Sequence, residues 1–214
     1  LYKENTSSGD FSISPDAMGR RALSNMILNL LTSTKGTGCA KFATEHYETA
    51  NNMTDRMAAL GALIDNKNAD REAVLSDFYA RFKDYPLVMD KWFGVQAGAE
   101  RDDIFEELEQ LKTHKDFSMK NPNRVRSLYG AFAMNNPVKF HDPGGRGYAF
   151  LKNGIIELNE INPQIAARMV TPLREWKRYT EDRQKKMKAA LQEIATLPNL
   201  SPNVYEIVTK SLNG

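Results

Sequence analysis

Apolar residues along this chain recur at intervals of three and four, the spacing that places them on one face of a helix. The first clear helix start is Ser14-Pro15-Asp16, which offers a hydroxyl for the N-cap, a proline for the first helical position and an acid for the positive end of the helix dipole. A buried stripe is predicted for the apolar residues that follow at helical spacing: Leu23, Met26, Ile27, Leu30 and Leu31. We expect this helix to end before the glycine-containing segment 35–38.

The same spacing predicts helices along most of the remaining sequence. They extend over residues 40–49, 52–64, 69–83, 87–97, 102–112, 121–132, 148–160, 162–179 and 181–196, and from 201 onward. A loop is expected from Asn135 to Gly147. The total is about eleven helices, and no stretch shows the clean alternation of apolar and polar residues that is typical of a strand.

Short turns join these helices, so neighbouring helices are expected to run antiparallel and to bury each other's apolar faces. The predicted fold class is therefore all-α, a right-handed α-α superhelix (an ARM/HEAT-like α-solenoid of antiparallel helix pairs). Because the sequence has no strict repeat at a fixed period, an irregular helical bundle is the alternative. We expect an extended N-terminal segment over 1–13, cut from a longer chain because Leu1 is not an initiator methionine, followed by a single α-solenoid domain over 14–214.

Composition places the chain among ordinary globular proteins. Its 41% hydrophobic residues, 26% charged residues and mean hydropathy of -0.54 fit neither a disordered nor a collagen-like chain, and no apolar run is long enough for a membrane span. The 29 basic and 27 acidic residues nearly balance, so net charge favours neither nucleic acid nor a membrane as partner. A single cysteine, Cys39, cannot form a disulfide within the chain, which favours a reducing, cytoplasmic location.

Histidine and cysteine give no recognisable metal or nucleophile motif. His46, His114 and His141 lie far apart and never at the i, i+4 spacing that directs two imidazoles toward one zinc ion. No metal site is therefore expected in this chain. We expect His46 to be a partly exposed helix residue and Cys39 to be a small buried residue without a histidine partner.

Two segments suggest anion binding, but each has a stronger alternative. The glycine-rich segment 143–147 could wrap a phosphate, yet it lies between predicted helices and lacks a Lys-Ser/Thr pair, so an ordinary connection is favoured. The segment 174–188 combines Lys and Arg with Trp176 and Tyr179, as nucleic-acid surfaces do. Acidic residues interleave with these cations, so a solvated helix face is favoured there.

The segment that begins at Asn162-Pro163 divides most clearly into two faces. The apolar face contains Ile165, Met169, Leu173 and Trp176, and the polar face, about 100° round the helix, contains Gln164, Arg168, Thr171 and Glu175. Gln164 and Arg168 place an amide and a permanent cation one turn apart, which suits the backbone and a carboxylate of a peptide. The residues alone favour a solvated face, with peptide binding as the alternative.

Several strings together indicate a family. They are residues 53–60, 91–93 with Gln96-Ala97, 122–128, Phe140-His141 with Gly147-Tyr148, and Asn162-Pro163-Gln164 with Ala167-Arg168. In this order and spacing, the sequence resembles the C-terminal helical domain of gluzincin zinc aminopeptidases of the aminopeptidase N (alanyl aminopeptidase) type. The resemblance covers essentially the whole chain, although the segment 135–147 departs from the commoner family form.

The resemblance implies a non-catalytic domain that caps the active site of a zinc aminopeptidase and gates peptide access, while the parent enzyme removes N-terminal amino acids. It implies substrate-binding roles for Gln164 and Arg168, which match the family's N-P-Q-x-A-x-R segment. The zinc motif H-E-x-x-H is absent from these residues, so zinc would belong to the catalytic domain of the same polypeptide, the implied partner besides peptide substrates. The alternative from another class is a stand-alone α-solenoid scaffold for protein–protein interaction.

Overall fold

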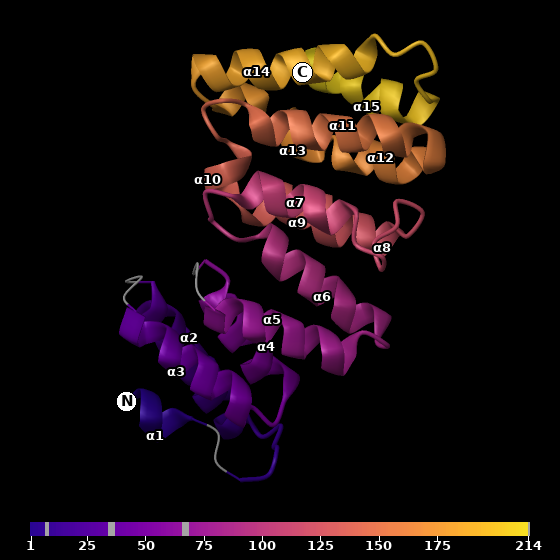
Figure 1. Ribbon diagram of the computed structural model, residues 1–214. Coiled ribbons are helices and arrows are strands. Elements are labelled where there is room, and N and C mark those ends of the chain that lie inside the picture. The colour runs from indigo at the N-terminus through magenta and orange to yellow at the C-terminus, as the bar shows by residue number, and fades with distance from the viewer. Residues whose placement is uncertain (7–8, 34–36, 66–68, 214) are drawn as a thin grey trace. The chain divides into compact units, whose positions relative to one another are not determined.

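The computed structural model describes residues 1–6, 9–33, 37–65 and 69–213, with the side chains of 37–39 and 69 outside the described set. Every regular element among these residues is helical (Figure 1), so the all-α prediction is confirmed for them. The chain divides into two compact units, residues 1–95 and 96–214. Each unit buries its own set of apolar side chains.

The described residues of unit 1 form six helices, and the last of them extends two residues past the boundary at Val95. They are α1 (Tyr2–Asn5), α2 (Pro15–Thr32), α3 (Thr37–Thr49), α4 (Met53–Leu63), α5 (Ala69–Phe82) and α6 (Pro86–Ala97). The predicted start of α2 is confirmed, because Ser14 Oγ accepts a hydrogen bond from the Ala17 N–H at 3.3 Å. Asn52 caps α4 in the same way, and α4 packs against both α2 and α3.

The short helix α1 lies within the segment that the sequence predicts to be extended. The Tyr2 hydroxyl is 2.8 Å from Nδ1 of His46, and the Tyr2 ring meets the Phe42 ring edge-on with centroids 6.2 Å apart. Both partners belong to α3, so these contacts hold α1 against it. The structure therefore differs from the expected extended segment at residues 2–5.

The buried face of α2 is not the face that the sequence predicts. Its buried residues are Arg21, Ser24, Asn25, Leu28 and Thr32. Leu23, Met26 and Leu30 of the predicted stripe are 39%, 62% and 59% exposed. The prediction is wrong because the interior beside α2 is polar: the Asn25 amide donates a hydrogen bond to the Asp55 carboxylate of α4 at 2.9 Å.

In three later helices of unit 1, apolar residues at helical spacing do face the core. Leu60 of α4, Phe78 of α5 and Phe93 of α6 are fully buried. The indole N–H of Trp92 donates to the Leu75 carbonyl at 3.1 Å, so the ring enters the core without an unpaired donor. In these three helices the core of unit 1 thus follows the apolar period, unlike along α2.

Unit 2 combines several short helical turns with longer helices. They are α7 (Ile104–Lys112), α8 (Pro122–Val125), the π-helix η1 (Arg126–Gly130), α9 (Ala131–Asn135), α10 (Pro137–Phe140), α11 (Arg146–Ile161), α12 (Pro163–Met169), α13 (Thr171–Arg174), the 3-10 helix η2 (Trp176–Arg178), α14 (Glu181–Ala195) and α15 (Pro202–Asn213). Asn121, Asn136 and Asn162 each cap a helix whose first residue is proline. Within the unit, α11 packs on α12 and α14, and α15 packs on α12 and α14 (Figure 1).

Two stretches of unit 2 differ from the prediction. The helix expected over 162–179 is interrupted near Val170 and becomes α12, α13 and η2. The cause is Pro172, which has no N–H to continue the helix and whose ring collides with the carbonyl four residues earlier. The loop expected over 135–147 contains α10, because the fully buried Asn136 caps a new turn there and donates to the Ala99 carbonyl at 2.6 Å.

Two glycines allow close approaches in unit 2. A Cβ at Gly147 would lie 2.2 Å from the Phe140 carbonyl oxygen, and a Cβ at Gly154 would lie 2.3 Å from Cε1 of Tyr129. The Tyr129 ring is stacked on Phe150 with centroids 4.7 Å apart. Neither position of α11 therefore accepts a larger residue without displacing α10 or the Tyr129 ring.

Candidate functional site

The candidate site is the outward face of α12. The Asn162 side chain accepts a hydrogen bond from the Ile165 N–H at 3.2 Å and so starts the helix. Ile165 and Met169 are buried, whereas Gln164 and Arg168 are exposed one turn apart. The structure thus brings the two predicted residues together on one side of a single helix.

Buried contacts hold this helix from beneath. α12 packs against α11 and α15, and the fully buried Leu173 of α13 extends the same apolar surface. The Trp176 indole N–H donates to the Ser211 carbonyl of α15 at 2.8 Å. Gln164 and Arg168 therefore project from a backbone that packing fixes, as a binding surface requires.

The electrostatics of the face leave both functional groups available. Within the described part of the chain, neither the Gln164 side chain nor the Arg168 side chain takes part in a hydrogen bond or an ion pair. An exposed guanidinium without a carboxylate partner can bind an anionic group in a bidentate manner. Thr171 and Glu175, predicted on the same face, are also exposed.

The basic segment 174–188 has the character of a solvated face. Arg178 lies 3.6 Å from Glu175, so an interleaved acid pairs with one of the cations. The ammonium groups of Lys177 and Lys188 each lie 5.4 Å from the centre of the Trp176 ring. A cavity of about 280 Å³ lies between α13, η2 and α15. It is lined by Arg174, Glu175, Lys177, Arg178, Lys210 and Ser211.

The glycine-rich segment 143–147 is a closed turn. The Gly144 N–H donates to the Asp142 carboxylate and the Gly145 N–H donates to the Asp142 carbonyl, both at 2.9 Å. Gly145 has a φ of 80°, which suits glycine. Arg146 lies over the Phe105 ring at 4.2 Å. Because Asp142 already occupies these N–H groups, they are not free to cradle a phosphate.

His46 is buried, so the expectation of a partly exposed residue is wrong. Its Nε2 lies 2.9 Å from Asn25 Oδ1, and its Nδ1 faces the Tyr2 hydroxyl. Burial lowers the pKa of His46, while the nearby Asp55 carboxylate opposes that shift. Sequence reasoning missed this chain of polar side chains because its members come from four different helices and have no shared spacing.

The other histidines also have structural partners. His141 Nδ1 lies 2.9 Å from the Tyr148 hydroxyl, and its ring lies 4.3 Å from the Tyr179 ring. Burial lowers the pKa of His141 and of His114. Among the residues that the structure describes, no group of three or more His, Cys, Asp or Glu side chains could hold a metal ion. The side chain of Cys39 lies outside the described set.

The helices pack against one another in pairs, and α12 presents a polar face while α11 and α15 pack against its apolar side. This arrangement is that of an α-helical repeat domain. The chain belongs to the family described as "Domain of unknown function (DUF3458_C) ARM repeats", whose model matches residues 1–213. The prediction of an ARM-like α-solenoid is thereby confirmed. Across the described ranges, no helix is both long and apolar enough to cross a bilayer.

Comparison with known proteins confirms the resemblance to aminopeptidases. The chain is 40% identical over 212 residues to aminopeptidase N of Caulobacter vibrioides and 39% identical over 212 residues to aminopeptidase N of Escherichia coli, which covers 99% of this chain but 25% and 24% of those proteins. The crystal structure of Legionella pneumophila aminopeptidase A in complex with aspartic acid matches with a TM-score of 0.89 at 29% identity, covering 99% of this chain and 26% of that chain. The chain thus spans about a quarter of the length of these relatives and corresponds to a domain of such aminopeptidases.

Proposed function

We propose that this chain is the non-catalytic helical domain of a cytoplasmic zinc aminopeptidase. In this proposal the domain caps the active site, limits which peptides enter, and presents Gln164 and Arg168 to the substrate. The observation that carries the proposal is the exposed, unpaired guanidinium of Arg168 in a chain that matches aminopeptidase N over nearly its whole length.

The chemistry of the two side chains suits a peptide. The Gln164 amide can donate to a backbone carbonyl and accept from a backbone N–H. The Arg168 guanidinium can form two parallel hydrogen bonds with a carboxylate. The Legionella relative was crystallised with aspartic acid, a ligand that carries carboxylates. A binding role near the peptide is therefore favoured over a purely solvated face.

Zinc is assigned to the remainder of the parent polypeptide. The described residues of this chain offer no cluster of three metal-binding side chains, so they do not fit a zinc ion. Hydrolysis and zinc binding are accordingly proposed for the catalytic domain, and this domain contributes positioning and access.

The test is kinetic and uses the full-length parent. Arg168→Ala is expected to lower kcat/KM for peptides between about tenfold and a hundredfold, because a charge-assisted hydrogen bond contributes roughly 1.5–3 kcal/mol. The matched control is Arg20→Ala, which removes an exposed arginine paired with Asp16 in unit 1. Unchanged kcat/KM for Arg168→Ala, or an equal loss for both variants, would contradict the substrate role.

The gene and the activity of the parent also distinguish our proposal from the alternative of a stand-alone scaffold. A scaffold requires a reading frame that starts close to Leu1, whereas our proposal requires several hundred additional residues that include a zinc motif. Purified parent that hydrolyses no N-terminal residue from peptides would favour the scaffold.

A further inference from the structure

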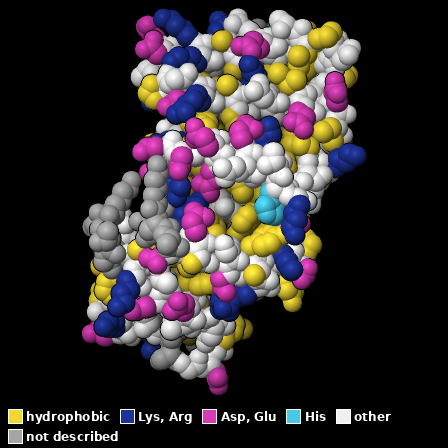
Figure 2. All heavy atoms as spheres, viewed as in Figure 1, with side chains coloured by type: hydrophobic (Ala, Val, Ile, Leu, Met, Phe, Trp, Pro, Cys, Tyr) yellow, Lys and Arg dark blue, Asp and Glu magenta, His cyan; other side chains and the backbone are white. Residues whose placement is uncertain are grey.

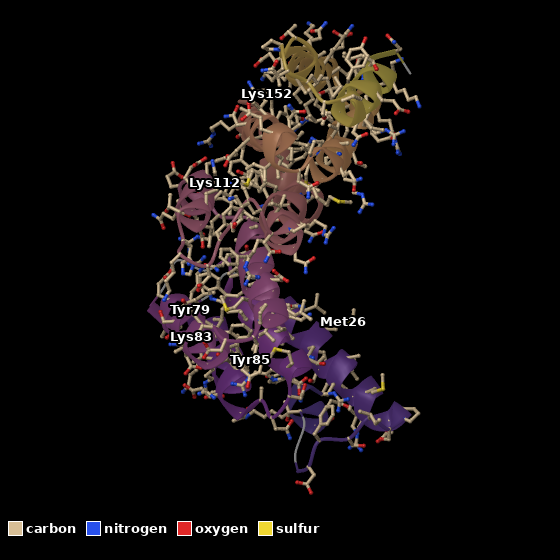
Figure 3. The ribbon with its side chains drawn as sticks, turned by 90° about the vertical axis from the view of Figure 1, so that its right-hand side faces the viewer. Met26, Tyr79, Lys83, Tyr85, Lys112 and Lys152 are labelled. Atoms are coloured by element: carbon tan, nitrogen blue, oxygen red, sulfur yellow. The ribbon has the colours of Figure 1, made fainter. Side chains whose placement is uncertain are left out.

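The outer face of α2 is an exposed apolar surface that the fold of unit 1 does not use. We define it as the outward-facing residues Met18, Ala22, Leu23, Met26 and Leu30. Its four large residues are 55%, 39%, 62% and 59% exposed for Met18, Leu23, Met26 and Leu30, respectively. Steps of three and four residues place them side by side along the helix. Met26 projects from this helix in Figure 3.

The second half of α2 lacks the charged outer face of an ordinary surface helix. No Asp, Glu, Lys or Arg occurs between Ala22 and Ser33. The polar residues Ser24 and Asn25 instead face inward, where Asn25 bonds to Asp55 and His46. A helix that stays in water normally has its charged side chains outward and its apolar ones inward. Exposed apolar side chains without outward charges beside them indicate that the outer face of α2 is covered in the functional protein.

We infer that the remainder of the aminopeptidase polypeptide packs on the outer face of α2. This inference rests on the proposed function, because it takes the chain to be one domain of a longer enzyme. The matched relatives are about four times as long as this chain, so a large covalently linked partner is available. Linkage gives that partner an effective concentration near the millimolar range, well above that of a second copy in dilute solution. An apolar, uncharged segment of the same polypeptide is therefore the occupant.

Methionine oxidation measures this coverage directly in the full-length protein. The native protein is treated with hydrogen peroxide, and the sulfoxide at each methionine is quantified by mass spectrometry against a urea-unfolded sample. Met89 and Met187 are fully buried and serve as internal references. We expect Met18 and Met26 to be protected as strongly as these references. Oxidation of Met18 and Met26 near the unfolded rate would overturn the inference.

Dilution identifies the occupant. Protection within one polypeptide does not depend on concentration, whereas protection by a second copy weakens as the protein is diluted. Concentration-dependent protection would therefore overturn the inference in favour of a dimer. Peptide hydrolysis measured on the same sample tests the proposed function separately, since an inactive protein can still show or lack this protection.

A pair of variants provides a second readout. Met26→Gln with Leu30→Gln makes the outer face of α2 polar while retaining good helix formers. Met26→Leu with Leu30→Met keeps it apolar. In the full-length protein, we expect the glutamine variant to lose Met18 protection by about tenfold and the control to retain it. Equal Met18 protection in both variants would contradict the inference.

Discussion

At the scale of single residues, a row of polar side chains determines which side of α2 faces the interior. Tyr2, His46, Asn25 and Asp55 follow one another with separations of 2.8 to 2.9 Å. Asn52 completes the row with a hydrogen bond to the second Asp55 oxygen at 2.8 Å. A buried network of this kind specifies one arrangement of its helices, because each member left unpaired would be costly.

Loss of Asp55 should therefore destabilise the protein strongly. Asp55→Ala leaves the buried Asn25 amide without its acceptor and removes one of the two acceptors of the half-buried Asn52 amide, so we expect the free energy of unfolding to fall by about 2–4 kcal/mol. Urea denaturation measures the change. Asp16→Ala, which removes an exposed partner of Arg20, should cost less than about 0.5 kcal/mol. Similar losses for both variants would contradict the role of the network.

Acid should weaken the same region through His46. Its pKa is lowered in the folded protein by burial, so the unfolded chain binds the proton more readily. The stabilising contribution of neutral His46 is present above the ordinary histidine pKa near 6.5 and is lost as the pH falls toward the lowered value.

Unfolding titrations between about pH 7.5 and pH 5.5 test this dependence. Each histidine of this type can add up to about 1.4 kcal/mol per pH unit to the slope, and His114 and His141 act in the same direction. His46→Gln should make the slope shallower. A slope identical to that of the unaltered protein would show that His46 does not carry the effect.

The Tyr129 hydroxyl differs from the hydrogen-bonded polar side chains around Asp55. It is buried and has no hydrogen-bond partner among the described residues, and burial raises the pKa of this phenol. Tyr129→Phe removes a polar group that gains nothing from the fold, so we expect the free energy of unfolding to rise by about 1 kcal/mol. Thermal and urea denaturation measure the change. A loss of stability would indicate that the hydroxyl has a partner after all.

At the scale of elements, local signals predicted where helices begin better than where they end. Caps such as Ser14, Asn121 and Asn162 are short-range features, and the structure bears them out. Pro172 was also a local signal for a helix end. The apolar spacing that continues over 162–179 nevertheless led to the prediction of one long helix. The inward face of α2 had no such signal, because its partners Asp55 and His46 lie 30 and 21 residues away from Asn25.

Some features of the candidate site follow from neighbouring residues in the sequence, and others depend on distant residues. The exposure of Gln164 and Arg168 follows from helical spacing, so the sequence predicted it correctly. Their role in binding depends on residues outside this chain and stays a prediction. The buried network around His46 required the packing of α1 to α4, which no spacing in the sequence encodes.

Two helical glycines provide a matched test of packing between elements. Gly154→Ala places a methyl group against the Tyr129 ring, and we expect a loss of about 1–3 kcal/mol or more in the free energy of unfolding. Gly61→Ala in α4 meets open space and should instead stabilise by about 0.5–1 kcal/mol through helix propensity. Urea denaturation of both variants compares them, and a stable Gly154→Ala protein would contradict the close contact.

At the scale of the whole molecule, charge is distributed without a dominant sign. Figure 2 shows acidic and basic side chains interspersed over the visible face of each unit, in keeping with 29 basic and 27 acidic residues. Long-range attraction of a polyanion is therefore not supported by the charge balance. Our proposals accordingly assign specific recognition to local features, the Arg168 side chain and the outer face of α2.

The contact between Gly154 and Tyr129 has a consequence for the evolutionary history of this domain. The two positions are separated in sequence by α9, α10 and the first half of α11, yet the Tyr129 ring occupies the space that a side chain at 154 would need. A lineage that acquires a bulkier residue at 154 should have replaced the aromatic ring at 129 by a smaller side chain, either beforehand or soon afterwards. Homologous sequences should therefore show correlated change at these two positions, with glycine retained wherever tyrosine persists.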